Sequence, residues 1–236
     1  MSVSEAATRR AIVECYRELA LRGLNVGAAG NVSVRFGAGM LITPTGVPPE
    51  ELAADAVVAA GFDGSHAGTL RPSSEWAMHA AVYQRLPDAG AVIHGHPDAC
   101  VALSCLRRPL PAFHYMVGGF GGDDVPCTPH LTFGTRALGE AAGEAMRQRT
   151  ACLLGSHGML ARGATLGEAY ETTERLEVLV RQYLLALAAG KPVLLTAQEI
   201  ALAGERYRDY GRNATAQTRP RRWNVPARRS TRKGQR

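Results

Sequence analysis

Two short runs of the sequence, AVIHGH (residues 91–96) and TACLLG (150–155), carry apolar residues at successive positions, and they constrain the fold strongly. Successive side chains of a strand point to opposite faces of its sheet, so a strand that is apolar at consecutive positions has to be covered on both faces. Helical patterns lie before, between and after these runs, and helices packed on both faces of one sheet form three layers. The sequence therefore predicts an α/β protein built as a three-layer α/β/α sandwich.

Helix and turn signals divide the rest of the chain into elements. A Ser or Thr followed three residues later by Glu is a capping box that starts a helix. Three such boxes predict helices from Ser2 to about Arg22, from Thr165 to about Gly190 and from Thr196 to about Tyr210. Apolar periodicity predicts three more, over residues 74–86, 98–106 and 134–149. Strand-like segments occupy residues 31–36, 39–44 and 56–62, the first two joined by Gly-Ala-Gly. Because so short a turn joins antiparallel strands, we expect a central mixed, largely antiparallel sheet.

The positive charge of the chain is concentrated at its C-terminal end. The net charge is +6, but nine of the 27 basic residues and no acidic residue follow Gly211, so that residues 1–211 are slightly acidic. We therefore expect one domain over residues 1–211 and a basic tail over 212–236 that has no fixed structure, since it lacks apolar periodicity. A nucleic-acid-binding arm, with Trp223 stacking on a base, is the competing interpretation; we favour a solvated extension.

Composition also narrows the cellular setting. No stretch of the sequence is apolar over the roughly 18 residues of a membrane helix, and the N-terminal segment is charged throughout, unlike a signal peptide. We expect a cytoplasmic protein that makes no membrane contact. The five cysteines are scattered and include no Cys-x-x-Cys pair, so neither a disulfide framework nor a thiolate zinc site is indicated.

The run AVIHGH places two of the seven histidines, His94 and His96, one residue apart. On a strand both side chains lie on one face, about 6.5 to 7 Å apart along the backbone, so both imidazoles can converge on one ion. A third histidine, His157, directly follows the second apolar run, and we expect Gly155 and Gly158 on either side of it to let the backbone turn tightly. Three neutral imidazoles with one coordination position open are typical of a catalytic zinc site. A hydrogen-bonded core position is the competing interpretation for each histidine, and we expect it for His66, His79, His114 and His130.

Several turns carry the groups that bind phosphate. Ser73 and Ser74 stand at the expected start of the 74–86 helix, where free N–H groups and the helix dipole attract an anion. Two further turns offer glycines for close backbone approach and side-chain donors, at Gly30 with Asn31 and at Thr45 with Gly46. Glu75 follows the serines, where a carboxylate either complements the helix dipole or, beside a metal ion, acts as a general base. Taken singly, each of these segments equally fits an ordinary turn.

Taken together, the motifs resemble a known family. They stand in fixed order along residues 5–211: Gly30-Asn31-Val32-Ser33, Thr43-Pro44-Thr45-Gly46, Ser73-Ser74-Glu75-Trp76, His94-x-His96, His114-Tyr115-Met116 and Ser156-His157-Gly158. In this set and order they resemble the class II aldolase/adducin family, most of all its members that act on L-fuculose 1-phosphate. The resemblance implies a zinc-dependent lyase that cleaves a ketose 1-phosphate, L-fuculose 1-phosphate or a close analogue, reversibly into dihydroxyacetone phosphate and a small aldehyde such as L-lactaldehyde.

The resemblance also implies roles for individual residues. One Zn²⁺ per chain would be bound by His94, His96 and His157, with Glu75 as catalytic acid/base and a fourth ligand when no substrate is bound. The residues expected to hold the substrate phosphate are Gly30, Asn31, Thr45, Gly46, Ser73 and Ser74. Tyr115 would reach the site of a neighbouring subunit to protonate the aldehyde oxygen, Phe133 would form a wall of the aldehyde pocket, and Tyr210 would close over the site. The resemblance further implies a homotetramer with sites between subunits; the Arg-rich tail departs from the family pattern.

Other functions on the same fold stay open. A pentulose-phosphate 4-epimerase typically has Asp where this chain has Glu75, which favours the aldolase. An aldolase for a 5-deoxy or 5-methylthio pentulose 1-phosphate and a methylthioribulose-1-phosphate dehydratase would share the metal and phosphate residues. A non-enzymatic adducin-like scaffold would lose metal ligands, all of which are present here. A serine hydrolase built on Ser156 is disfavoured because GSHG is not the G-x-S-x-G nucleophile elbow.

Overall fold

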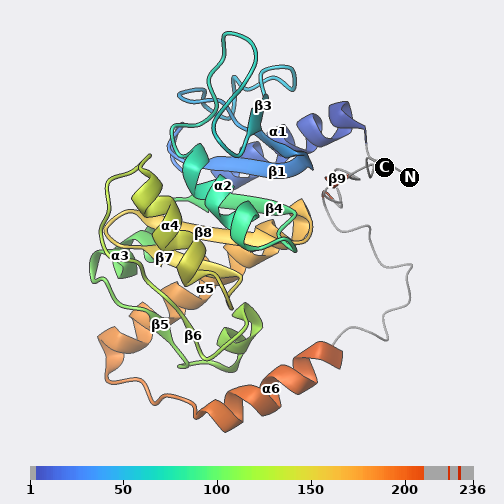
Figure 1. Cartoon of the computed structure of the whole chain (residues 1–236). Coiled ribbons are helices and arrows are strands. Elements are labelled where there is room, and N and C mark those ends of the chain that lie inside the picture. The colour runs from blue at the N-terminus through green and yellow to red at the C-terminus, as the bar shows by residue number, and fades with distance from the viewer. Residues whose placement is uncertain (1–3, 210–222, 224–227, 230–236) are drawn as a thin grey trace.

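A twisted antiparallel sheet forms the middle layer of the computed structural model, which describes residues 4–209, 223 and 228–229 (Figure 1). Its strands are β1 (Asn31–Gly37), β2 (Gly39–Ile42), β3 (Val58–Gly61), β4 (Ala91–Gly95), β7 (Ala151–Leu154) and β8 (Gly158–Gly163). They lie in the order β3-β2-β1-β4-β8-β7, and every neighbouring pair is antiparallel. The short β9 (Arg228–Arg229) pairs with the end of β1 in parallel, so the sheet is mixed. This confirms the predicted mixed, largely antiparallel sheet.

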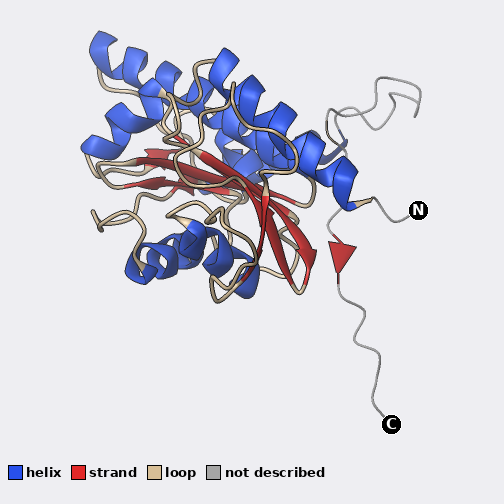
Figure 2. Ribbon diagram, turned by 90° about the horizontal axis from the view of Figure 1, so that it is seen from above, coloured by secondary structure: helices blue, strands red, loops and turns tan. Residues whose placement is uncertain are grey.

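Helices cover both faces of this sheet (Figure 2). They are α1 (Glu5–Leu21), α2 (Trp76–Arg85), α3 (Asp98–Cys105), α4 (Arg136–Ala145), α5 (Leu166–Ala189) and α6 (Ala197–Asp209). On one face α1, α3 and α5 pack against the sheet; on the other, α2 and α4 do. A 3-10 helix, η1 (Tyr115–Phe120), and a small ribbon of β5 (Leu110–Pro111) and β6 (Asp124–Val125) lie near α3 and α6. The predicted α/β/α sandwich is therefore confirmed.

Strand β4 shows why the histidines face one layer and not the other. Ala91 and Ile93 are fully buried among α1 and α5 side chains, whereas Val92 is buried among those of α2 and α4. His94 lies two residues beyond Val92, on the same face of the strand. The alternation therefore directs the His94 imidazole toward the N-terminus of α2, where Glu75 stands.

Some element predictions were wrong in detail. The first helix begins at Glu5 with Ser4 as its N-cap, since the Ser4 hydroxyl accepts a hydrogen bond from the Ala7 N–H; Ser2 lies outside the described residues. Strand β8 was not predicted. The 134–149 helix is shorter, Arg136–Ala145, because Thr135 is its N-cap and accepts from the Leu138 N–H.

Little of the proposed tail, 212–236, falls within the described residues. Trp223 does, and its indole N–H donates to the Glu14 carboxylate at 3.2 Å. The same ring meets Tyr170 edge-on, with ring centroids 5.0 Å apart. Trp223 therefore lies against the α1 and α5 layer, and Arg228–Arg229 form β9 beside β1, so the expectation of a tail without fixed structure fails at these residues. For the rest of the tail it stays a prediction.

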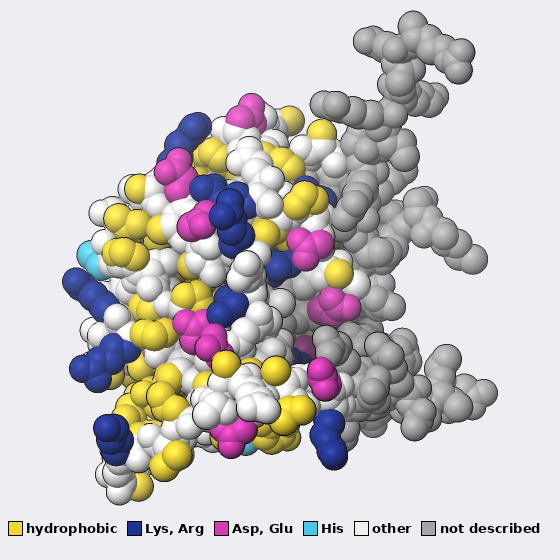
Figure 3. Space-filling view, turned by 60° about the horizontal axis from the view of Figure 1, so that its bottom comes forward, with side chains coloured by type: hydrophobic (Ala, Val, Ile, Leu, Met, Phe, Trp, Pro, Cys, Tyr) yellow, Lys and Arg dark blue, Asp and Glu magenta, His cyan; other side chains and the backbone are white. Residues whose placement is uncertain are grey.

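The described surface carries charges of both signs. On the face shown in Figure 3, basic and acidic side chains are interspersed among apolar ones, so that face presents no field of a single sign. Within the described residues, no helix combines the length and the apolarity that crossing a bilayer requires.

A buried carboxylate fixes the chain just beyond His96. Helix α3 follows Pro97, which provides no side-chain cap. Instead Glu177 of α5, only 3% exposed, accepts hydrogen bonds from the N–H groups of Ala99 at 3.1 Å and Cys100 at 3.0 Å. A negative charge at a helix N-terminus also complements the helix dipole. Glu177 thus ties α3, and with it the end of β4, to α5.

Replacing this carboxylate should cost stability. In Glu177→Gln one of the two N–H donors faces an amide NH₂ in place of an oxygen, so the free energy of unfolding should fall by about 1–3 kcal/mol. Urea denaturation of the metal-free protein measures it. Glu171→Gln, on the exposed side of the same helix, is the control and should change stability by less than about 0.5 kcal/mol. Equal stability of the two variants would contradict the capping role of Glu177.

Candidate metal centre and phosphate pocket

Two antiparallel pairings bring the three histidines together. His94 and Gly95 of β4 pair with Leu160 and Met159 of β8. The turn between β7 and β8 contains His157, and it lies beside the end of β4, where His96 follows the strand. The predicted convergence of His94, His96 and His157 is therefore present in the structure.

The three imidazoles face one another closely. One ligand atom from each lies within 4.8 Å of the other two. The Nε2 atoms of His94 and His96 are 2.9 Å apart, and the ring centroids of all three pairs lie between 4.7 and 5.0 Å apart. Nitrogen atoms at about 2.0–2.1 Å from a shared Zn²⁺ would be separated by comparable distances, so the arrangement fits one ion.

The tautomer of His94 also fits a metal ligand. Its Nδ1 lies 2.8 Å from the carbonyl oxygen of Met159, which only accepts hydrogen bonds, so Nδ1 carries the proton. In the neutral ring the Nε2 lone pair then points into the cluster. A backbone carbonyl that orients a histidine in this way is a common second partner of metal-binding imidazoles.

Close packing explains the glycines around His157. A side chain at Gly155 would place its Cβ 2.5 Å from the Thr128 carbonyl oxygen, and one at Gly158 would lie 2.5 Å from the His96 ring. The tight turn itself is made by Ser156, whose φ of 55° is left-handed. The expectation that the two glycines make the turn is therefore wrong, because they are needed for close approach between segments.

Glu75 completes the cluster from the opposite layer. It occupies the N-cap position of α2 without capping the helix, and its side chain is buried among the imidazoles. One carboxylate oxygen, Oε2, lies 3.1 Å from His94 Nε2, and Oε1 lies 3.4 Å from His157 Nε2. Within the described part of the chain, Oε1 has no hydrogen-bond partner although it is buried. An orphaned oxygen beside three inward-facing nitrogens fits a fourth metal ligand.

The pKa values of His96, His157 and Glu75 are shifted in the directions that favour metal binding. Burial, followed by the neighbouring imidazoles, lowers the pKa of His96 to about 4, and burial followed by the His94 ring lowers that of His157 to about 4. Burial raises the pKa of Glu75, but the adjacent imidazoles and the Asn31 amide together lower it to about 2. Neutral imidazoles and an ionised carboxylate are therefore available near neutral pH.

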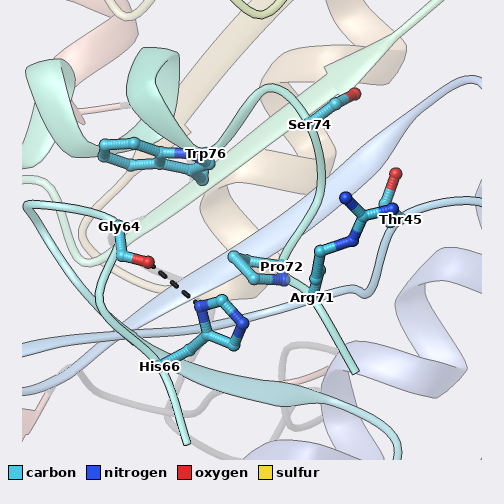
Figure 4. A pocket seen from close by; sticks show the side chains of 7 residues that line it. All are labelled: Thr45, Gly64, His66, Arg71, Pro72, Ser74 and Trp76. Carbon is cyan, nitrogen blue, oxygen red and sulfur yellow. Dashed lines mark hydrogen bonds between the residues drawn. The ribbon is translucent and has the colours of Figure 1, made fainter. Parts of the chain in front are cut away.

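Beside this cluster lies a pocket that matches part of the predicted phosphate site. Segments 43–46 and 71–74 run side by side, since Thr45 N–H donates to the Arg71 carbonyl and Ser73 N–H to that of Thr43. The cavity between them has a volume of about 250 Å³ and is lined by Thr45, Gly64, His66, Arg71, Pro72, Ser74 and Trp76 (Figure 4). Thr45 and Ser74 were predicted. Arg71 was not, although a basic residue directly before Pro-Ser-Ser is a readable signal for an anion site.

The remaining predicted phosphate residues are not among those that line this pocket. Ser73 is buried, and its hydroxyl accepts a hydrogen bond from the Glu75 N–H, while the N-cap position of α2 is occupied by Glu75. Gly46 has a left-handed φ of 72° and open space at its Cβ position. Gly30 packs against Asn25. Asn31 is 3% exposed, and its amide donates to Glu75 Oε2 at 3.1 Å.

The residues predicted for the aldehyde end are exposed. Phe133 is 66% exposed and precedes Gly134, whose Cβ position is 3.1 Å from the Ser74 carbonyl oxygen, so its loop lies against the pocket. Tyr115, on η1, is 50% exposed and stacks on His114 at a centroid distance of 4.6 Å. The structure does not pair it with the histidine cluster of its own chain within the interactions described. Tyr210 lies outside the described residues.

The stability of the metal-free protein should depend on pH through its buried histidines. Burial and then His94 also lower the pKa of His79, to about 3. Unfolded histidines titrate near 6.5, so below that pH the unfolded chain binds protons that the folded chain does not, and stability falls as pH drops from about 6.5 toward 4. Urea denaturation at pH 7 and pH 5 measures this loss. The loss of stability between pH 7 and pH 5 should be smaller in the double variant His96→Gln/His157→Gln. An equal loss in the wild type and the double variant would contradict the lowered pKa values.

Comparisons with known proteins agree with this geometry. Residues 10–184 match the family model described as Class II Aldolase and Adducin N-terminal domain. The chain is 46% identical over 203 residues to L-fuculose phosphate aldolase of Escherichia coli O6:H1, covering 86% of this chain and 94% of that protein. It is 41% identical over 220 residues to 5-methylthioribulose-1-phosphate/5-deoxyribulose-1-phosphate aldolase of Rhodospirillum rubrum, covering 93% and 100%.

A solved structure of an L-fuculose 1-phosphate aldolase superposes with a TM-score of 0.82 at 36% identity, over 88% of this chain and 98% of that one. The sheet order, the histidine cluster and these likenesses all lead to one assignment. The chain belongs to the class II aldolase and adducin family, among its aldolases.

Proposed function

We propose that this protein is a zinc-dependent aldolase that reversibly cleaves a ketose 1-phosphate into dihydroxyacetone phosphate and a small aldehyde. The observation that carries the proposal is the buried cluster of His94, His96 and His157 with the Glu75 carboxylate between them. Its relatives include an L-fuculose phosphate aldolase at 46% identity. L-fuculose 1-phosphate is the first candidate substrate.

The donor set favours zinc. Imidazoles and a carboxylate suit a borderline divalent ion, and three histidines with a position left for substrate are typical of catalytic Zn²⁺. When bound, such an ion supplies a Lewis acid for the negative charge released as the carbon–carbon bond breaks. A Schiff-base lysine is then unnecessary, and the chain has only two lysines, Lys191 and Lys233, of which Lys191 lies in the segment after α5.

Glu75 is the group that moves the proton at carbon. In cleavage, the bond between C3 and C4 breaks, its electron pair stays with the C1–C3 fragment, and C3 then takes a proton to give dihydroxyacetone phosphate. A carboxylate that stands beside the cluster and at the start of α2 is placed to give that proton, and to remove it in the reverse direction. The Asn31 amide, which donates to Oε2 at 3.1 Å, holds the carboxylate in place.

The pocket beside Glu75 is the proposed phosphate site. Ser74 precedes Glu75 directly, and Thr45 lies on the neighbouring segment. Arg71 adds an exposed guanidinium to these hydroxyls, and charge-assisted hydrogen bonds to a phosphate are stronger than neutral ones. A phosphate held there, remote from the bond that breaks, orients the sugar.

The aldehyde end of the site is proposed to come from a second subunit. Tyr115 is half-exposed and is presented on η1 at the surface, as a residue that serves a neighbouring chain would be. It would exchange the proton of the C4 oxygen. Phe133 would form a wall of the aldehyde pocket and Tyr210 would close it; a homotetramer with sites at its interfaces accommodates these roles.

A second substrate class has specific support. The Rhodospirillum rubrum relative acts on 5-methylthioribulose 1-phosphate and 5-deoxyribulose 1-phosphate, and the match covers its entire length. These sugars share the phosphate and the reacting carbons with L-fuculose 1-phosphate and differ at the aldehyde end, where the exposed Phe133 stands. The aldehyde pocket therefore decides between the two.

Metal dependence is the first test. The purified protein should contain one zinc ion per chain by elemental analysis, and removal of the metal with a chelator should abolish cleavage of L-fuculose 1-phosphate, with recovery on adding Zn²⁺. His94→Ala, which removes one ligand, should lower zinc affinity at least about 10-fold, as losses of supporting groups around metal sites already do. Undiminished cleavage by the metal-free protein or by His94→Ala would rule out the mechanism.

Substrate choice is the second test. The values of kcat/KM for L-fuculose 1-phosphate, ribulose 1-phosphate, 5-deoxyribulose 1-phosphate and 5-methylthioribulose 1-phosphate should rank the candidates. A missing or added small apolar group in a pocket is worth about 10- to 200-fold, so the preferred sugar should stand out. Faster epimerisation of ribulose 5-phosphate than cleavage of any of these would instead establish the epimerase.

A further inference from the structure

A buried chain of hydrogen bonds runs from the core to Glu75. The Tyr83 hydroxyl lies 2.8 Å from Ser33 Oγ, and Ser33 Oγ lies 2.7 Å from His79 Nδ1. His79 Nε2 bonds in turn to Asn31 Oδ1, whose amide Nδ2 lies 3.1 Å from Glu75 Oε2. This series of hydrogen bonds thus ends at the Glu75 carboxylate, which faces the metal-binding histidines.

Two secondary-structure periodicities build this chain. Glu75, His79 and Tyr83 are spaced four residues apart at the start of α2 and along it, so they follow one face of the helix. Asn31 and Ser33 are two residues apart on β1, so they share the face of the sheet that α2 covers. The helix lies over the strand, and its polar residues interleave with those of the strand.

Chemistry fixes the direction of every bond in the chain. A carboxylate only accepts, so the Asn31 NH₂ donates to Glu75 and its Oδ1 faces His79. That oxygen also only accepts, so His79 Nε2 must carry the proton. A neutral His79 then has its lone pair on Nδ1, which accepts from the Ser33 hydroxyl, and Ser33 accepts from Tyr83. The four hydrogen bonds therefore run in one consistent direction, from the Tyr83 hydroxyl to the Glu75 carboxylate.

The groups in this chain of hydrogen bonds lie in the core of the protein and not at its surface. His79 and Ser33 are fully buried, and Tyr83 is 1% exposed. They lie within the apolar cluster between α2 and the sheet, where a polar group without a partner costs about 1–3 kcal/mol. The guanidinium of Arg35 covers the outer face of the Tyr83 ring, 4.8 Å from its centre. Apolar side chains could fill this space without the cost of burying polar groups. Stability therefore does not explain why these residues are polar, which favours a functional role.

We propose that His79 is a positioning residue for the lyase reaction, which with Ser33 and Tyr83 behind it holds the Asn31 amide in the one orientation that donates to Glu75. This inference rests on the proposed function of the site. Without the His79 donor, the amide can turn and present Oδ1 to the carboxylate. The amide oxygen and the carboxylate would repel each other. Glu75 would then leave the position between His94 and His157 from which it transfers the proton to and from C3.

The test compares variants that differ in whether they keep the donor. His79→Leu removes it, while His79→Gln retains an N–H near the position of Nε2. At equal zinc content and with folding checked by circular dichroism, His79→Leu should lower kcat about 10- to 100-fold, the range seen when groups that orient metal-site residues are removed. His79→Gln should recover most of the loss. Ser33→Ala should fall between them, because His79 is then free to change tautomer.

A matched control separates positioning from substrate binding. Arg71→Gln, which weakens the proposed phosphate site, should raise KM more than it lowers kcat, whereas His79→Leu should act mainly on kcat. If the wild-type protein cleaves none of the sugar phosphates, the proposed function fails. If the wild type is active and folded His79→Leu and Ser33→Ala both keep the wild-type kcat, the inference fails and the function stands.

A readout without substrate completes the test. In ¹⁵N-histidine spectra of the zinc-loaded protein, the signal that disappears in His79→Gln belongs to His79. It should show a protonated Nε2 and an unprotonated Nδ1 at neutral pH, and Ser33→Ala should shift it toward a mixture. A His79 protonated on Nδ1, or a signal indifferent to Ser33→Ala, would overturn the proposed direction of the chain even if the variants are too unstable for kinetics.

Discussion

The backbone pairing on the two edges of β4 is the constraint on which the candidate site depends. On one edge His94 lies opposite Asn31 of β1, and on the other it lies opposite Leu160 of β8, next to Met159, whose carbonyl fixes its tautomer. These ladders set the register, and a shift by one residue would turn His94 away from α2. The site is thus positioned by main-chain hydrogen bonds in the centre of the sheet, which are among the most rigid parts of a domain.

The polar groups of the site are gathered on the α2 side of the sheet at a cost in desolvation. Helix α2 contributes Glu75, and the Asn31 amide and the imidazoles surround its carboxylate. Most of their atoms have partners, but Glu75 Oε1 and His157 Nδ1 are buried without one in the described residues. Such orphans are rare in folded proteins unless a ligand completes them. In the metal-free protein these unpaired buried atoms therefore lower stability, and a bound ion would compensate for that cost.

Much of the fold and of the metal cluster was predictable, because it rests on local periodicity. Apolar residues at consecutive positions identified β4 and β7, and capping boxes located the starts of α5 and α6 at Thr165 and Thr196. Strand β8 was not predicted, because its six residues include Arg162, which interrupts the apolar pattern. In the structure the Arg162 guanidinium donates hydrogen bonds to the Asp88 carboxylate and to the Arg149 carbonyl. The role of the glycines beside His157 was misjudged, since a close approach between distant segments leaves no local mark in the sequence.

The sequence by itself determined which chemistry is present: three histidines after two buried strands, a carboxylate at a helix start, and hydroxyl-rich turns. Their spacing encodes the face on which each side chain lies, because strand and helix periods are properties of the local backbone. Only the tertiary structure decided which groups meet: Arg71 joining Thr45 and Ser74 at one pocket, Glu177 holding α3, and His79 supporting Asn31. Such contacts depend on how helices pack across the sheet, and packing is settled by the summed burial of many side chains rather than by any one segment.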